Sequence, residues 1–241
     1  MASTNKCTYC GKEFAKERTL QVHLCEPKRR YLQRDEKWVV NAFMVFQRFY
    51  QIHQHNSKTK TYDDFVKSSY YNAFVKFGRF IMHINPLYPE KYIDYVLQSK
   101  VKLDHWARDD LYELYLIEAL KSEPVEAALQ RSITTMMDWA TEQNAQWSDY
   151  FRLVNPNRAV QHIQQGKISP WLLLGCNAGQ RMLKSFNDEQ LQMTEKFINP
   201  SFWPSKLKSY PADHMLVQDT CLLYTSPSPR DLSTSRMPSS A

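Results

Sequence analysis

The sequence predicts a mainly α fold, in which a small N-terminal ββα unit precedes an all-α helical domain. The 241-residue chain has only 5 glycines, and because tight turns and hairpins need glycine, helices joined by short polar loops are favoured. A hydrophobic content of 43%, including 13% aromatic residues, is enough for a substantial core. Three of the 5 cysteines fall within residues 7–25, where they are typical of metal ligands in a reducing compartment.

The ββα unit is predicted from the spacing of its cysteines and histidine. Cys7-x2-Cys10 is followed after twelve residues by His23, which is the ligand spacing of a C2H2 zinc finger. Phe14 and Leu20 stand where such a finger places its small apolar core. We expect these ligands to bind Zn²⁺, and we expect zinc to supply most of the folding free energy, about 10 kcal/mol or more in finger peptides.

The fourth ligand is predicted to be Cys25, although a C2H2 finger normally places it three to five residues beyond the first histidine. Cys25 follows His23 after only two residues. Positions i and i+2 of a helix lie on different faces, so both reach one metal only if the helix ends near Leu24, and Pro27 is consistent with such an end. A water ligand or an incomplete site is the alternative.

The finger also predicts a nucleic-acid-binding surface. If it docks as DNA-binding fingers do, Lys16, Thr19 and Val22 face the bases. Lys16 can donate to guanine, whereas Val22 cannot form a side-chain hydrogen bond. One finger covers about three base pairs, so we do not expect sequence-specific binding by this unit alone.

The segment after the finger, residues 28–37, is rich in cations. It contains Lys28, Arg29, Arg30, Arg34 and Lys37, interrupted by two acidic residues. One interpretation is a solvated linker. The other is an arm whose Lys28, Arg29, Arg30 and Arg34 contact phosphates. Of these residues, Lys28, Arg29 and Arg30 would make up to three contacts. The second interpretation predicts a nucleic acid partner, with DNA favoured over RNA.

The helical domain is predicted over residues 38–220, with about eight helices. Val39, Phe43, Phe46 and Tyr50 recur at helical spacing, as in the core-facing stripe of an amphipathic helix. Residues 62–84 are predicted to form one long helix or two, and their many aromatic residues are expected in the core rather than on a base-stacking platform.

Between Leu111 and Leu120 the charged positions are Glu113 and Glu118, and a helix that is apolar nearly all round must be surrounded by other helices, so residues 105–121 are expected to form a central helix. Turns before helix starts are predicted at Asn85-Pro86, Asn155-Pro156 and Asn199-Pro200, and Ser169-Pro170 and Ser122 are expected to cap helices.

No pattern typical of catalysis is found, so we expect that the protein is not an enzyme. The sequence has no Gly-rich phosphate loop, and no nucleophile with a nearby base. Asp109 and Asp110 are adjacent, so they point about 100° apart on a helix and fit a charged first turn better than a catalytic pair. The absence of a long apolar run predicts a cytoplasmic protein with no membrane partner.

The last 21 residues differ in character from the rest of the chain. Back-translated, Cys221 to Asp231 and Ser235 to Ala241 resemble the transposase end and adapter used in DNA sequencing libraries. We therefore expect residues 221–241 to be an adapter-derived artefact without packed structure, and the native chain to continue differently after Thr220. A natural disordered tail is the alternative.

Three further segments carry a resemblance: KTYDDFVKSSYYNAFVKFGRF (Lys60 to Phe80), KLDHW (Lys102 to Trp106) and GKISPWLL (Gly166 to Leu173). Over residues 1–219 the chain resembles a family of uncharacterised zinc-finger proteins from T4-like marine bacteriophages. The resemblance implies a tailed-phage protein located in the cytoplasm of the infected host cell. It implies no activity.

Two functions are therefore expected as alternatives. In the first, the protein is a zinc-binding accessory protein that binds nucleic acid through the finger and the basic segment, while the helical domain contacts a phage or host replication or transcription protein. In the second, the finger is a protein-contact device and no nucleic acid is bound. Residues 1–37 hold nine Lys or Arg against five Asp or Glu, and this uneven placement of charge favours the first alternative. Val22 and the lack of a second finger favour the second.

Overall fold

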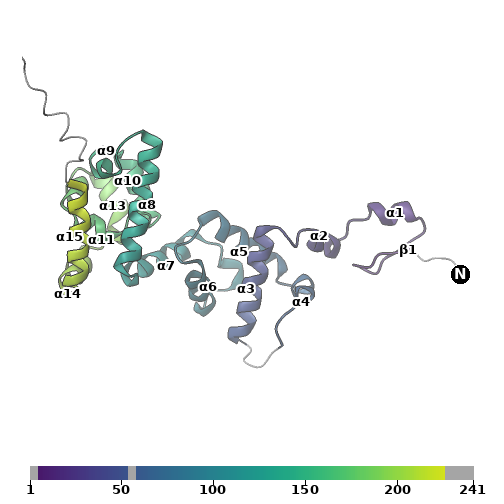
Figure 1. Ribbon diagram of the computed structural model, residues 1–241. Coiled ribbons are helices and arrows are strands. Elements are labelled where there is room, and N and C mark those ends of the chain that lie inside the picture. The colour runs from purple at the N-terminus through teal and green to yellow at the C-terminus, as the bar shows by residue number, and fades with distance from the viewer. Residues whose placement is uncertain (1–4, 54–57, 226–241) are drawn as a thin grey trace, which may run out of the picture. The chain divides into compact units, whose positions relative to one another are not determined.

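The computed structural model describes residues 5–53 and 58–225, which are mainly helical (Figure 1). The elements in chain order are β1 (Asn5–Lys6), β2 (Glu13–Phe14), α1 (Glu17–Val22), α2 (Glu26–Leu32), α3 (Lys37–His53), α4 (Tyr62–Lys67), α5 (Tyr71–Ile84), α6 (Pro89–Gln98), the 3-10 helix η1 (Leu103–His105), α7 (Asp109–Ser122), α8 (Val125–Gln143), η2 (Trp147–Asp149), α9 (Tyr150–Leu153), α10 (Pro156–Gln164), α11 (Pro170–Gly175), α12 (Asn177–Lys184), α13 (Asp188–Ile198), α14 (Trp203–Ser209) and α15 (Pro211–Thr225). The predicted fold class is confirmed: a short hairpin and one helix precede a chain of helices.

The chain divides into two compact units, an N-terminal unit of residues 1–115 and a C-terminal unit of residues 116–241. The segment 38–220, predicted as one helical domain, is therefore shared between the units. The division falls inside α7, within the stretch 111–120 whose charged residues are Glu113 and Glu118. The first half of α7 buries Leu111 and Tyr115, and its second half buries Leu116 and Leu120. No proline, glycine or serine run marks the boundary, so composition does not reveal it.

The core of the N-terminal unit is built on the crossing of α3 and α5. Gly78 lies at the crossing, where an added Cβ would come within 2.3 Å of the Trp38 carbonyl oxygen and 2.9 Å of the Ala42 nitrogen. No residue with a side chain fits there without separating the helices. Of the predicted stripe on α3, Val39 and Phe46 are buried.

The aromatic residues of residues 62–84 lie mainly in this core, as expected. Phe65, Tyr71, Phe74 and Phe77 are all buried. Phe46 and Phe74 meet edge to face, with ring centroids 5.4 Å apart. The segment forms two helices because α4 ends at Lys67, and the extended Ser68 separates it from α5.

The C-terminal unit contains a buried ion pair between Glu123 and Arg131. The Glu123 side chain is fully buried, and the Arg131 guanidinium donates to it at 2.5 and 2.8 Å. Arg131 also donates to the Gly166 carbonyl at 2.6 Å, and the Ser169 hydroxyl donates to Glu123 at 2.9 Å. These bonds tie the turn before α11 to α8.

The predicted helix start after Asn155 and the predicted cap at Ser169 are both confirmed. Asn155 and Ser169 each accept a bond from the backbone N–H two residues on, at the starts of α10 and α11. Ser122, predicted to cap a helix, is the last residue of α7, and its hydroxyl donates to the Glu118 carbonyl at 2.9 Å.

The C-terminal helix α15 continues past Thr220 to Thr225, and Cys221 is only 9% exposed. The expectation that residues 221–241 lack packed structure therefore fails at Cys221. Leu222 and Leu223 are strong helix formers, which favours continuation of the helix. Residues 226–241 lie outside the described residues.

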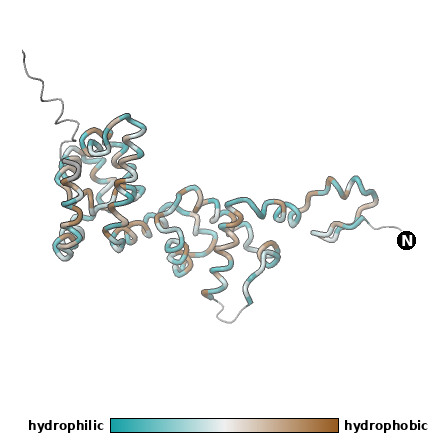
Figure 2. The backbone as a smooth tube through the Cα atoms, in the orientation of Figure 1, coloured by the Kyte–Doolittle hydropathy of each residue, from teal (hydrophilic) through white to brown (hydrophobic). Residues whose placement is uncertain are grey.

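The described helices are amphipathic in most cases, and hydrophilic and hydrophobic positions alternate along them (Figure 2). None of them combines the length and the apolar character that crossing a bilayer requires.

Candidate metal centre

The hairpin holds two of the predicted ligands in its turn. β1 and β2 pair antiparallel, with Asn5 opposite Phe14, and Cys7 and Cys10 lie between the strands. Gly11 has a φ of +71°, in the left-handed region that favours glycine. The turn closes through bonds from the Cys7 N–H to the Lys12 carbonyl and from the Gly11 N–H to the Cys7 carbonyl, both of 2.8 Å.

This turn also prepares the Cys7 thiol for metal binding. The backbone N–H of Cys10 donates to the Cys7 sulfur and lowers the pKa of that thiol below its ordinary value. The thiolate is the form of cysteine that binds metals, so the turn favours this form at Cys7. At Cys10 a backbone hydrogen bond from Lys12 acts in the same direction, but burial and the neighbouring Cys7 and Cys25 thiols raise the pKa of the Cys10 thiol above its ordinary value.

His23 and Cys25 reach the same point from an extended segment. The helix α1 ends at Val22, and both His23 (φ −67°, ψ 121°) and Cys25 (φ −84°, ψ 164°) have extended backbone. Side chains at i and i+2 of an extended segment point to the same side, whereas on a helix they diverge. His23 and Cys25 can therefore bind one metal ion despite their two-residue spacing. The helix ends at Val22, two residues before the end near Leu24 that this spacing required.

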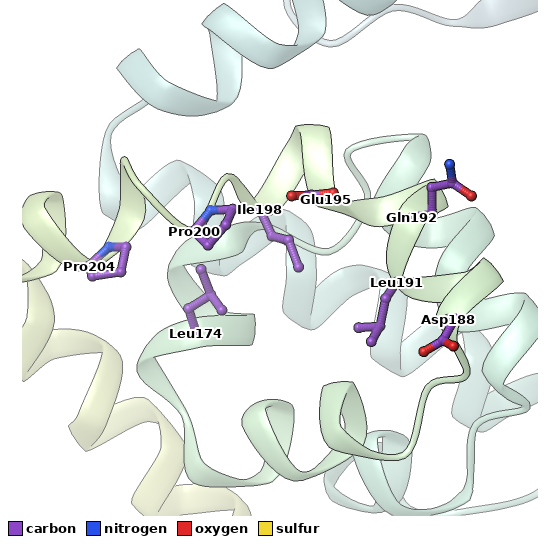
Figure 3. A pocket seen from close by; sticks show the side chains of 8 residues that line it. All are labelled: Leu174, Asp188, Leu191, Gln192, Glu195, Ile198, Pro200 and Pro204. Carbon is purple, nitrogen blue, oxygen red and sulfur yellow. The ribbon is translucent and has the colours of Figure 1, made fainter.

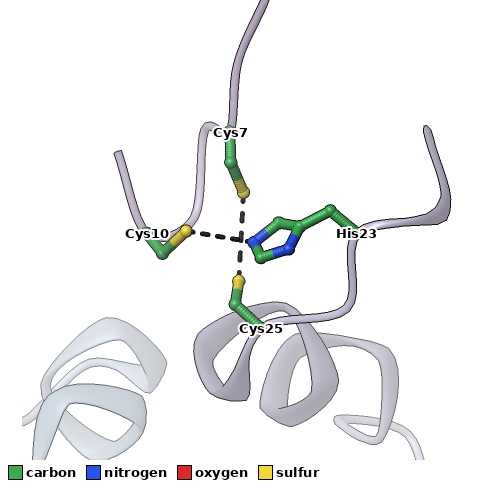
Figure 4. Close-up of side chains that lie close together, drawn as sticks. All are labelled: Cys7, Cys10, His23 and Cys25. Carbon is green, nitrogen blue, oxygen red and sulfur yellow. Dashed lines mark hydrogen bonds between the residues drawn. The ribbon is translucent and has the colours of Figure 1, made fainter. Parts of the chain in front are cut away.

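The structure brings all four predicted ligands together (Figure 4). The ligand atoms of Cys7, Cys10, His23 and Cys25 lie within 4.8 Å of one another. The Cys7 and Cys25 sulfurs are 3.9 Å apart, and the Cys10 sulfur is 3.2 Å from the His23 Nε2. Tetrahedral zinc would place two sulfurs about 3.8 Å apart, and a sulfur and a nitrogen about 3.6 Å apart. The cluster can therefore hold a four-coordinate metal ion.

The finger that carries the metal cluster has little apolar core of its own. No residue of α1 is buried, and Phe14 and Leu20 are only half-buried. Phe14 packs against the His23 ring, with centroids 4.6 Å apart. Burial on this scale does not fold a unit of some 25 residues, so a bound ion would have to provide the missing free energy.

The finger residues predicted to face bases are exposed. Lys16 precedes α1 as its N-cap, and Thr19 and Val22 follow at three-residue intervals. Such spacing places them near one face of the helix. Val22 is 75% exposed and the adjacent Leu24 is 61% exposed, so this surface is partly apolar.

The four cations predicted as an arm differ in their surroundings, because residues 28–32 belong to the helix α2. Lys28 donates to the His23 carbonyl at 3.0 Å. Arg29 is 55% exposed along its side chain and pairs with Glu26. Arg34 is exposed and pairs with Asp35 at 3.4 Å.

Arg30 is the exception, since its side chain is only 16% exposed. Its Nη1 donates to the Val66 carbonyl at 2.5 Å, and its Nε lies 3.1 Å from a Glu26 oxygen. The guanidinium also lies over the Tyr71 ring, 4.2 Å from the centroid. Arg30 therefore holds α2 against α4 and α5 in this structure.

A row of tyrosines, which sequence reasoning missed, joins the hairpin to the helices of the N-terminal unit. The Tyr9 and Tyr31 ring centroids are 5.2 Å apart, and those of Tyr31 and Tyr62 are 5.7 Å apart. The Tyr62 hydroxyl donates to the Arg30 carbonyl at 2.8 Å, and the Tyr31 hydroxyl donates to Asp63. No local sequence pattern predicts these contacts, because the residues that contact each other are about 20 to 30 positions apart in the chain.

Comparison with known proteins gives no relative: no protein-family model, no curated protein and no solved structure matches the chain. The chemistry of the metal cluster and of the surface around it therefore has to support any assignment of function.

Proposed function

We propose that the protein is a zinc-binding protein whose metal-organised N-terminal finger binds nucleic acid. The donor set supports zinc, because three thiolates and one imidazole form the soft, four-coordinate set of structural zinc sites, with no carboxylate. All four positions are supplied by the chain, which leaves none for a substrate. The zinc would therefore have a structural role.

The observation that carries the nucleic acid proposal is the set of unpaired cations around the cluster. Lys12, Lys16 and Arg18 are exposed, and within the described residues no carboxylate forms an ion pair with them. Zinc would fix these side chains on one small unit. Cations without a carboxylate partner that are held together in this way favour phosphate contacts, and the binding would be salt-dependent and weakly selective for sequence.

The proposed contacts include Thr19, Arg29 and Arg34, which are also exposed. Arg29 and Arg34 form only exposed ion pairs, which are weak and can be exchanged for phosphate. Lys28 and Arg30 contribute less in this proposal, because they are less exposed and donate to backbone carbonyls of the chain. From the resemblance to the T4-like phage family we infer a setting in the infected cell, with a replication or transcription protein as partner of the helical units. DNA remains the favoured nucleic acid.

The second candidate function is protein contact through the finger. It is favoured by the exposure of Val22 and Leu24, which would lie unprotected beside a phosphate backbone. The two candidates differ in the side chains on which binding depends.

The test is fluorescence anisotropy with labelled single-stranded DNA, duplex DNA and single-stranded RNA at low salt. Zinc-loaded protein should bind, and the double variant Lys16→Ala, Arg18→Ala should weaken binding and flatten its salt dependence. Lys184→Ala with Lys208→Ala, two exposed cations of the C-terminal unit, is the charge-matched control. If all three nucleic acids fail to bind the zinc-loaded protein, protein contact becomes the better candidate.

A further inference from the structure

The C-terminal unit contains an apolar groove that lies apart in sequence from the metal cluster (Figure 3). Its volume is about 470 Å³. Leu174, Leu191 and Ile198 supply apolar side chains to its lining, and Pro200 and Pro204 line one end. Leu174 comes from α11, Leu191 and Ile198 come from α13, and the prolines belong to the turn before α14 and to its first residues.

The helix α13 has apolar residues on two sides, and the protein covers only one of them. Thr194 and Phe197 are buried, with exposures of 0% and 3%, on the side packed against the unit. Leu191 and Ile198 are seven residues apart, or about two turns, and face the groove. Leu191 nevertheless remains 38% exposed. An uncovered apolar stripe in a groove is the feature that helix-in-groove recognition uses.

The rim of the groove is acidic, although the whole chain carries a net charge of +6. Asp188 and Glu195 line it, and both are exposed. No ion pair involves either carboxylate among the described residues. They stand two turns apart along α13, about 10 Å from each other and on the same side of the Leu191 and Ile198 stripe, so their charges border one side of the apolar floor. An occupant with an apolar face and cations along one side of it would satisfy floor and rim together.

We propose that this groove docks a basic amphipathic helix of a partner protein. Apolar side chains at i, i+3 or i+4, and i+7 of that helix enter the groove beside Leu174, Leu191 and Ile198. Lysine or arginine side chains along one side of this stripe pair with Asp188 and Glu195. The charge of the rim selects this occupant over an acidic helix, which would place like charges together.

The probe is a synthetic 18-residue peptide of leucine and lysine, with leucine at i, i+3, i+4 and i+7, labelled with fluorescein and titrated with the full chain. We expect saturable binding of one peptide per chain that weakens as salt is raised. Leu191→Asn should weaken binding about tenfold or more, since one apolar contact is lost. Because Leu191 is partly exposed, the circular dichroism of this variant should match that of the parent.

The rim is tested by Asp188→Asn with Glu195→Gln, which should weaken binding and flatten its salt dependence. Glu126→Gln with Asp138→Asn changes the charge equally on exposed positions of α8 and should leave binding unchanged. Equal binding of a leucine-glutamate peptide of the same pattern would overturn the proposal. So would unchanged binding by the Leu191 variant, or a parent chain that self-associates through Leu191 and excludes the peptide.

Discussion

Replacing Arg30 with alanine distinguishes a residue that holds α2 in place from one that contacts phosphate. The substitution removes a charged hydrogen bond to the Val66 carbonyl and a cation–π contact with Tyr71. The first is worth about 1.5–3 kcal/mol and the second about 0.5–2 kcal/mol, and such losses are not fully additive. Because the Arg30 side chain is only 16% exposed, hydrogen bonds to water replace little of the free energy that these two contacts contribute. We expect the opening of α2 to become easier by about 2–3 kcal/mol.

Arg29→Ala is the matched control. Arg29 lies one position earlier on the same helix, is 55% exposed along its side chain, and pairs with the same Glu26. A surface pair of this kind within a helix contributes about 0.5 kcal/mol or less. The two variants remove the same charge from α2, so the Arg30 contacts alone should account for the difference in stability.

The assay is hydrogen exchange of the full chain, followed in peptides that cover Glu26–Leu32. A change of 2–3 kcal/mol corresponds to about 30- to 150-fold faster exchange in Arg30→Ala, with little change in Arg29→Ala. On duplex DNA the order should reverse, since Arg29→Ala should flatten the salt slope by about 0.9 and Arg30→Ala should not. Exchange in α2 of Arg30→Ala within threefold of the parent would refute the reasoning.

Three other predictions follow from the structure. Metal analysis should find about one zinc per chain, which Cys25→Ser reduces and the buried non-ligand control Cys176→Ser does not. Gly78→Ala should lower the free energy of unfolding in urea by about 1–3 kcal/mol or more, because the new Cβ would lie 2.3 Å from the Trp38 carbonyl oxygen; an unchanged midpoint would contradict the helix crossing. Burial lowers the pKa of His162 to about 4, so the unfolded state, with a pKa of about 6.5, binds the proton first. Stability should therefore fall as the pH drops from about 6.5 towards 4, and His162→Gln should remove that part of the pH dependence; parallel curves for parent and variant would contradict it.

The metal cluster and the helical fold class could be predicted from the sequence because both depend on local spacing. Cys7, Cys10 and His23 occur at intervals that a hairpin and one short helix convert directly into a shared site. Likewise, Asn155 and Ser169 cap their helices through the next two residues, so no distant partner is needed. Helical periodicity is equally local, and it identified Val39 and Phe46 as core residues.

What only the tertiary structure decided involves partners far apart in the chain. Cys25 completes the cluster because α1 ends at Val22 and the following backbone is extended, which ligand spacing alone leaves open. Arg30 is a residue type that commonly contacts phosphate. In the structure its guanidinium instead binds the Val66 carbonyl and the Tyr71 ring, which are 36 and 41 residues later in the chain. The uncovered side of α13 is likewise visible only once Thr194 and Phe197 are known to be buried. A sequence specifies which groups can interact, whereas burial and competition among distant groups decide which interactions are made.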